Sequence, residues 1–176
     1  MKNKSFSNLL ILTSAFVTII SSVNPWILIF WMNKDFLVSW NYLLFLIQFL
    51  LYQFLHWWLF HILSNSLFIY IFWNQLESFI WNKRYITFFI LNSIFVWVAL
   101  LFLSTWTTIW ISWFAMAILA YITMELKRRK NPEYKSALLF LWINVAIGLT
   151  WNISFVWHLF WAIFGIMFYF FNKKSY

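Results

Sequence analysis

Residues 112–130 read SWFAMAILAYITMELKRRK, an apolar segment that ends in four consecutive basic residues. The 15 residues from Ser112 to Leu126 span about 22 Å as a helix at 1.5 Å per residue. Similar apolar runs recur along the whole chain, and about 20 such residues cross the roughly 30 Å of hydrocarbon in a bilayer. Basic residues at one end of such a run mark its cytoplasmic side. The stretch therefore predicts a transmembrane helix that reaches the cytoplasm at Lys127.

The composition also indicates an integral membrane protein. Of the 176 residues, 65% are hydrophobic, 26% are aromatic and only 9% are charged, which is too little polar surface to cover a soluble globule. The net charge of +8 could suggest nucleic acid, but the basic residues lie at the ends of apolar runs. We therefore expect a lipid bilayer as partner and no nucleic acid. The absence of cysteine excludes disulfides, thiolate metal sites and a cysteine nucleophile.

Six apolar segments define the predicted fold class, an all-α integral membrane protein of six transmembrane helices. The predicted spans are residues 8–31, 56–76, 85–103, 112–126, 137–151 and 155–170, with an outer interfacial loop over 32–55, all in a single domain over 1–176. Eleven of the twelve basic residues then share one side, and only Lys34 lies on the other. The positive-inside rule places both termini in the cytoplasm of a multi-pass cell-membrane protein. Pro25 should kink the first span.

Three polar residues stand inside these apolar stretches at a similar depth. Ser112 and His158 each lie 15 residues before a lysine, and His61 lies 16 residues before Glu77. Burying a hydroxyl or an imidazole costs roughly 1 to 3 kcal/mol unless it finds a partner. Their shared depth therefore predicts a polar site inside the membrane.

Each of these residues also has an ordinary structural interpretation. His61 and Asn65 share a helix face and could stabilise an oxyanion or simply join two helices. A membrane serine commonly donates to its own backbone, and a lone histidine can pack or bind a metal. We expect no metal site, because there is no HExxH motif and three of the four acidic residues, Glu77, Glu125 and Glu133, lie at the cytoplasmic side. The basic run at 127–130 is interpreted as a topology signal that also meets anionic lipid.

Taken together, these residues resemble the rhomboid intramembrane serine proteases. The resemblance combines His61-Ile-Leu-Ser-Asn65 in the second span, Ser112 at the start of the fourth, and His158 with Gly165 seven residues later in the sixth. It extends over residues 48–170. Single motifs of this kind are weak, but their joint order, spacing and sidedness are fairly specific.

Further positions extend the resemblance beyond these motifs. His56 precedes the second-span motif by five residues, as in bacterial members, and Glu77 stands where the family has a glutamate. Both are expected to support the site. Tyr121, nine residues after the serine, also matches.

The resemblance implies a serine protease that needs no cofactor. Ser112 would be the nucleophile and His158 its general base, a dyad without an aspartate. Asn65, His61 and the Ser112 backbone N–H would hold the tetrahedral oxyanion. The implied substrate is the transmembrane helix of another protein, and nothing in the sequence indicates an oligomeric state.

The chain also departs from the family pattern. Family members surround the serine with glycines as GxSG, whereas residues 110–113 read Trp-Ile-Ser-Trp. The glycine three residues after the sixth-span histidine is Trp161, and the tyrosine four residues after the serine is Met116. Three functions therefore stay open. They are an active protease, a catalytically silent relative that binds membrane helices, and a small membrane transporter subunit such as a vitamin-binding component.

Overall fold

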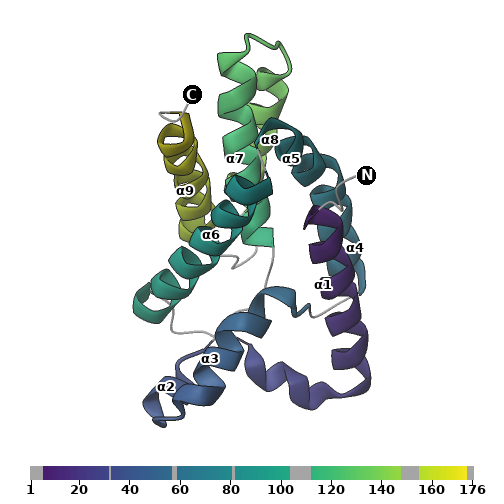
Figure 1. Cartoon of the computed structure of the whole chain (residues 1–176), viewed down its shortest axis with the longest axis vertical. Coiled ribbons are helices and arrows are strands. Elements are labelled where there is room, and N and C mark those ends of the chain that lie inside the picture. The colour runs from purple at the N-terminus through teal and green to yellow at the C-terminus, as the bar shows by residue number, and fades with distance from the viewer. Residues whose placement is uncertain are drawn as a thin grey trace. The chain divides into compact units, whose positions relative to one another are not determined.

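The computed structural model describes residues 6–31, 33–56, 59–80, 82–103, 112–147 and 155–173 (Figure 1). The elements are α1 (Phe6–Val23), the 3-10 helix η1 (Pro25–Phe30), α2 (Asp35–Val38), α3 (Tyr42–Leu51), the 3-10 helix η2 (Tyr52–Phe54), α4 (Leu59–Phe68), the π-helix η3 (Ile69–Trp73), α5 (Asn74–Phe79), α6 (Asn82–Leu103), α7 (Ser112–Arg128), α8 (Tyr134–Ile147) and α9 (Phe155–Lys173). These ranges contain no strand, which confirms the predicted all-α class.

Each of the six predicted spans contains helix among its described residues, while residues 57–58 and 148–151 of these spans lie outside the described ones. The second is built from α4, η3 and α5 in succession, and the predicted outer loop contains α2, α3 and η2. Pro25 has the expected effect, because α1 ends at Val23 and the chain resumes as a 3-10 helix from Pro25. Proline has no N–H and clashes with the carbonyl four residues earlier, so the α-helix cannot continue through it.

One described helix, α1, is both long and apolar enough to cross a membrane by length and composition. Three further helical stretches, Tyr42–Phe54, Tyr134–Ala146 and His158–Asn172, are apolar but shorter. The chain divides into two compact units, each described separately below. The first unit comprises Met1–Tyr70 and Phe89–Ile111, and the second comprises Ile71–Phe88 and Ser112–Tyr176.

In the first unit, α1 is arranged inside out compared with a helix of a soluble protein. It buries Ser7, Ser14 and Ser21 and exposes large apolar side chains, Leu9, Leu12, Phe16 and Ile19 among them, at 57 to 67%. In water, the apolar face would be the buried one. Small residues inside and large apolar residues outside are instead typical of a helix that packs among others in lipid.

The outer segment of the first unit packs onto the C-terminal part of α6. Phe45 and Phe49 of α3 contact the Trp97 ring, with centroids 5.0 and 5.1 Å apart. The buried Tyr52 hydroxyl donates to the Ser93 carbonyl at 3.3 Å, and this burial raises the pKa of Tyr52. The segment is therefore a folded part of the unit.

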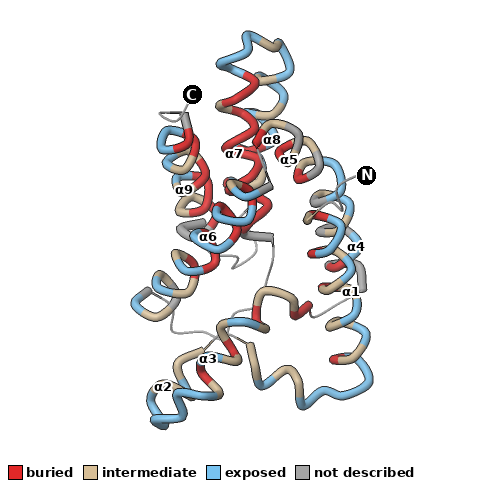
Figure 2. The backbone as a smooth tube through the Cα atoms, viewed as in Figure 1, coloured by how far each residue is buried: buried red, intermediate tan, exposed pale blue. Residues whose placement is uncertain are grey.

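In the second unit, α7 is the central helix. Its residues from Phe114 to Thr123 are all buried, and Figure 2 shows α7 red over much of its length. α7 packs most extensively on α9 and also on α8. Rings from α6 and α9 cover it, and Phe88 stacks on Phe168 with centroids 4.3 Å apart. A helix that is apolar all round needs such a buried place.

Candidate active site

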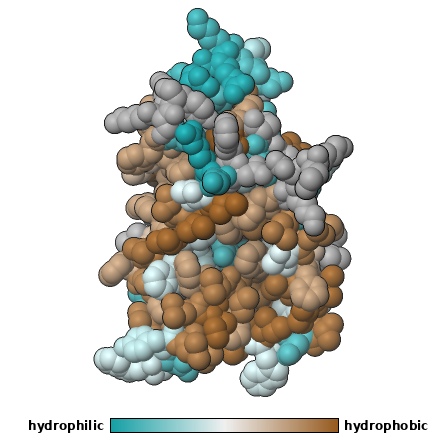
Figure 3. Space-filling view, in the orientation of Figure 1, coloured by the Kyte–Doolittle hydropathy of each residue, from teal (hydrophilic) through white to brown (hydrophobic). Residues whose placement is uncertain are grey.

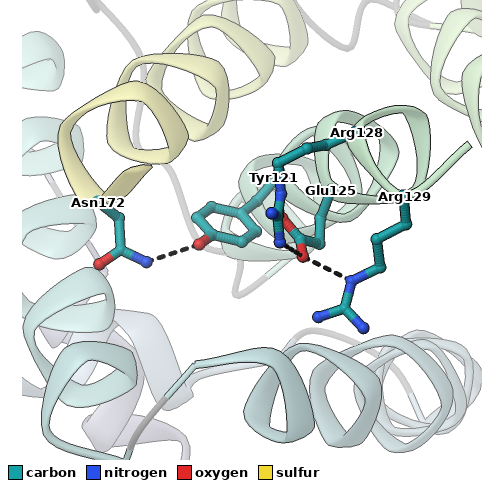
Figure 4. A network of polar contacts seen from close by, with 5 residues as sticks. All are labelled: Tyr121, Glu125, Arg128, Arg129 and Asn172. Atoms are coloured by element: carbon teal, nitrogen blue, oxygen red, sulfur yellow. Dashed lines mark hydrogen bonds and ion pairs between the residues drawn. The ribbon is translucent and has the colours of Figure 1, made fainter. Parts of the chain in front are cut away.

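Two contacts between α7 and α9 place the ends of these helices relative to each other. A β-carbon added to Gly165 would lie 2.1 Å from the Ala117 carbonyl oxygen, so the two backbones nearly touch there. Further along both helices, the Asn172 side-chain amide donates to the Tyr121 hydroxyl at 2.7 Å (Figure 4). In each helix, the residue of the second contact comes later in the chain than the residue of the first. The two helices therefore run parallel.

This arrangement sets the levels of the two candidate dyad residues. Ser112 lies five residues before Ala117, and His158 lies seven residues before Gly165. At 1.5 Å per residue these are axial distances of about 7.5 and 10.5 Å. Both residues therefore lie on the N-terminal side of the close contact, at levels about 3 Å apart along the helices.

His158 lies on the face of α9 that meets α7. It shares this face with Gly165 and Asn172, because the three are spaced by seven residues. The side chain is 8% exposed. Its Nδ1 is buried without a hydrogen bond of standard geometry among the described residues, although the ring also lies near the backbone of Asn144 in α8. Buried polar atoms are normally paired, so this nitrogen stands out.

The side chains of the other predicted catalytic and oxyanion residues lie outside the described ones. Ser112 is the first residue of α7, and only its backbone is described. The same holds for His61 and Asn65, which belong to the first unit. The helix predicted beneath that pair is present as α4, so their spacing of four residues keeps them on one face.

The two expected supporting residues belong to different units. His56 in the first unit is 2% exposed and precedes α4. Its Nδ1 lies 3.1 Å from the Phe54 carbonyl and 3.3 Å from the Thr18 hydroxyl of α1, so it ties the outer segment to α1. Glu77 in the second unit is half-buried on α5.

Two of the residues that replace family positions, Met116 and Trp161, are buried in the second unit, whereas the side chains of Trp110 and Trp113 lie outside the described ones. Trp161 is fully buried and Met116 is 5% exposed. The tryptophan that stands in place of a glycine therefore fills space inside the unit. Ala162 beside it is 5% exposed, which keeps that side of α9 compact.

The sequence did not lead us to predict a polar network that lies near the C-terminal ends of α7 and α9. Arg128 donates to Glu125 at 2.9 and 2.5 Å, and Arg129 donates to the same carboxylate at 2.6 Å (Figure 4). The hydrogen bond to Glu125 raises the pKa of the Arg128 guanidinium. Asn172, bonded to Tyr121, was also missed, although its spacing of fourteen residues from His158 was a usable signal.

The described helices first indicate the general class of this protein. The described residues form helices without strands, and α1 buries small serines while it exposes large apolar side chains, which is the pattern of a membrane-embedded helical bundle. Comparison with protein-family models matches residues 44–174 to the Rhomboid domain. The chain therefore belongs to the rhomboid family and is a membrane protein. A search of curated proteins found no significant match.

Proposed function

We propose that this rhomboid-family protein is an intramembrane serine protease with Ser112 as nucleophile and His158 as general base. In the proposed topology the chain crosses the membrane six times as a single domain in the cell membrane, with both termini in the cytoplasm. Rhomboid proteases act on transmembrane proteins within the bilayer, and we infer the same class of substrate here. The particular substrate is left open.

The observation that carries the proposal is the parallel packing of α7 and α9. The contact between Ala117 and Gly165 fixes the two helices side by side, with both dyad residues toward their N-terminal ends. The buried His158 Nδ1, which lacks a standard hydrogen bond among the described residues, supports a functional role for this imidazole. A nucleophile and its base must come within hydrogen-bond reach, and helices in such close contact favour this.

The chemistry follows from these roles. Ser112 Oγ attacks the scissile carbonyl while His158 accepts the hydroxyl proton and later gives it to the leaving amine. His61, Asn65 and the Ser112 backbone N–H would stabilise the negative charge on the tetrahedral oxygen, and losing one such donor typically costs about 3 kcal/mol of barrier. Water then hydrolyses the acyl-enzyme. His56 and Glu77 are proposed to support the site from outside the reacting groups.

An activity-based probe tests the proposal directly. A serine-directed fluorophosphonate should label the wild type in membranes, and Ser112→Ala and His158→Ala should both abolish labelling. Ser136→Ala is the matched control, because Ser136 is an exposed serine of the same unit, and it should label like the wild type. Folded wild-type protein that does not label, or Ser112→Ala protein that labels fully, would contradict the proposal.

The second candidate is a catalytically silent rhomboid relative that binds membrane helices. The fully buried Trp161 favours it, because small residues are what let helix backbones approach closely at a family glycine position. In that case the wild type would not label, and capture of a transmembrane partner would survive Ser112→Ala. The family assignment gives no support to a transporter subunit.

A further inference from the structure

The segment 125–135, where α7 ends and α8 begins, concentrates positive charge. It carries four consecutive basic residues, Lys127 to Lys130, followed by Lys135, against two carboxylates. One of these carboxylates, Glu125, is 5% exposed and is fully engaged by Arg128 and Arg129. Arg129 also lies over the Phe79 ring, 4.5 Å from its centroid. The arginines are thus committed within the unit, and their role is structural.

The side chains of the neighbouring lysines make no such ion pairs with the residues that the structure describes. Lys127, Lys130 and Lys135 are all exposed. Among the described residues, none of their side chains has an ion-pair or hydrogen-bond partner. We call these three residues the lysine cluster. Their ammonium groups remain available for an external anion.

The backbone of Lys130 is unusual for a residue other than glycine. Its φ of 54° lies in the left-handed region. The Asn131 N–H bonds the Leu126 carbonyl at 3.0 Å across this residue, which is the usual way to close a helix C-terminus. Glycine normally occupies such a position, because a β-carbon is disfavoured there. A lysine at a strained position is a reason to look for a function of its side chain.

The surroundings of the cluster indicate what kind of anion it would meet. Next to it, α8 exposes Leu138, Leu139 and Trp142. Figure 3 shows the hydrophilic residues gathered at the tip of the α7–α8 hairpin. Cations at the border of an apolar helix surface match the headgroup layer of a bilayer, where anionic lipids attract lysines.

We propose that the lysine cluster binds the phosphate of an anionic phospholipid headgroup while the lipid's acyl chains lie along the exposed apolar face of α8. The site is independent of the proposed protease activity, since it uses none of the residues assigned to the dyad or the oxyanion. Free inorganic phosphate offers the same charge without the acyl chains. It should bind much more weakly.

Thermal unfolding of the full chain in mixed micelles tests the site. Phosphatidylglycerol should raise the unfolding temperature more than phosphatidylcholine does, and inorganic phosphate at the same concentration should not reproduce the rise. Lys130→Gly should weaken the apparent phosphatidylglycerol affinity about five-fold. The same variant should be more stable than the wild type in phosphatidylcholine, because glycine relieves the left-handed strain. A variant that is merely misfolded would instead lose both phosphatidylglycerol affinity and stability in phosphatidylcholine.

Further variants separate local binding from a general charge effect. Lys127→Gln should weaken the phosphatidylglycerol affinity by a similar factor, without any change at the strained position. Lys34→Gln is the control, because Lys34 lies in the first unit, outside the cluster, and it should leave the affinity unchanged. An undiminished phosphatidylglycerol effect in Lys130→Gly, an equal effect of inorganic phosphate, or an equal loss in Lys34→Gln would each overturn the proposal.

Discussion

Helices α1 and α9, one in each unit, both carry a polar stripe with a seven-residue repeat, but the two stripes are built differently. The stripe of α1 consists of Ser7, Ser14 and Ser21, and that of α9 consists of His158, Gly165 and Asn172. On α1, the Ser21 hydroxyl donates to its own helix at the Thr18 carbonyl, 2.9 Å away. On α9, the Asn172 amide reaches across to α7.

This difference indicates how specifically each stripe selects the helix that packs against it. A stripe of small serine side chains, of which Ser21 bonds its own backbone, makes a smooth surface that different neighbours can pack against. A glycine in backbone contact and an amide bonded to one tyrosine fit a single partner helix in a single register. The α9 stripe is therefore the one that fixes its helix to a single neighbour, and substitutions there should have the larger effects.

Gly165→Leu should have the largest effect on the α9 side of the comparison. Even a β-carbon would lie 2.1 Å from the Ala117 carbonyl oxygen, and backbone cannot move aside as a flexible side chain can. We expect a loss of several kcal/mol in unfolding free energy, above the usual 1 to 3 kcal/mol for overpacking. Unfolding in mixed sodium dodecyl sulfate micelles measures it. Ile163→Leu, at a position 41% exposed on the same helix, should be nearly neutral, and tolerance of Gly165→Leu would show that the two helices separate readily.

Trp161→Gly should have the next largest effect, although it restores the residue that the family pattern contains. Trp161 is fully buried, and truncating a buried tryptophan typically costs about 3 to 5 kcal/mol because a cavity remains. Trp142→Gly is the matched control, since Trp142 is 59% exposed on α8, and its smaller loss should come mainly from the glycine itself. A Trp161→Gly protein as stable as the wild type would mean that α7 and α9 close over the space.

Breaking the cross-helix hydrogen bond should have a moderate effect. Tyr121→Phe and Asn172→Ala each remove one partner of a buried bond 2.7 Å long. Each change should lower the unfolding free energy by about 1 kcal/mol, and the double variant should reveal a coupling energy of about 0.6 kcal/mol. If the two losses simply add, the bond contributes nothing to joining the helices. The comparable test in α1, Ser21→Ala, should show no coupling to another helix.

The sequence predicted these helices better than it predicted their contacts. Apolar runs and the basic residues at their ends predicted segments that each contain helix, and Pro25 marked the end of α1. The pairing of Tyr121 with Asn172 was not predicted, because their separation of 51 residues leaves no local pattern. Burial of Trp161 was also not predicted, since tryptophan in membrane proteins is enriched at the membrane–water interfaces. Helix formation depends on local sequence, whereas packing depends on residues far apart in the chain.

Ser14→Ala, in the stripe of α1, should have the smallest effect on the free energy of unfolding. The Ser14 side chain is 1% exposed, and its hydroxyl has no hydrogen-bond partner among the described residues. Removing a buried hydroxyl that has no partner is neutral or slightly stabilising, within about 1 kcal/mol, and alanine keeps the small contact surface. Ser14→Ile, which enlarges the same position, should instead destabilise the protein by about 1 to 3 kcal/mol. If Ser14→Ala were the more damaging of the two, α1 would depend on a specific hydrogen bond as α9 does, and the distinction between the two stripes would fail.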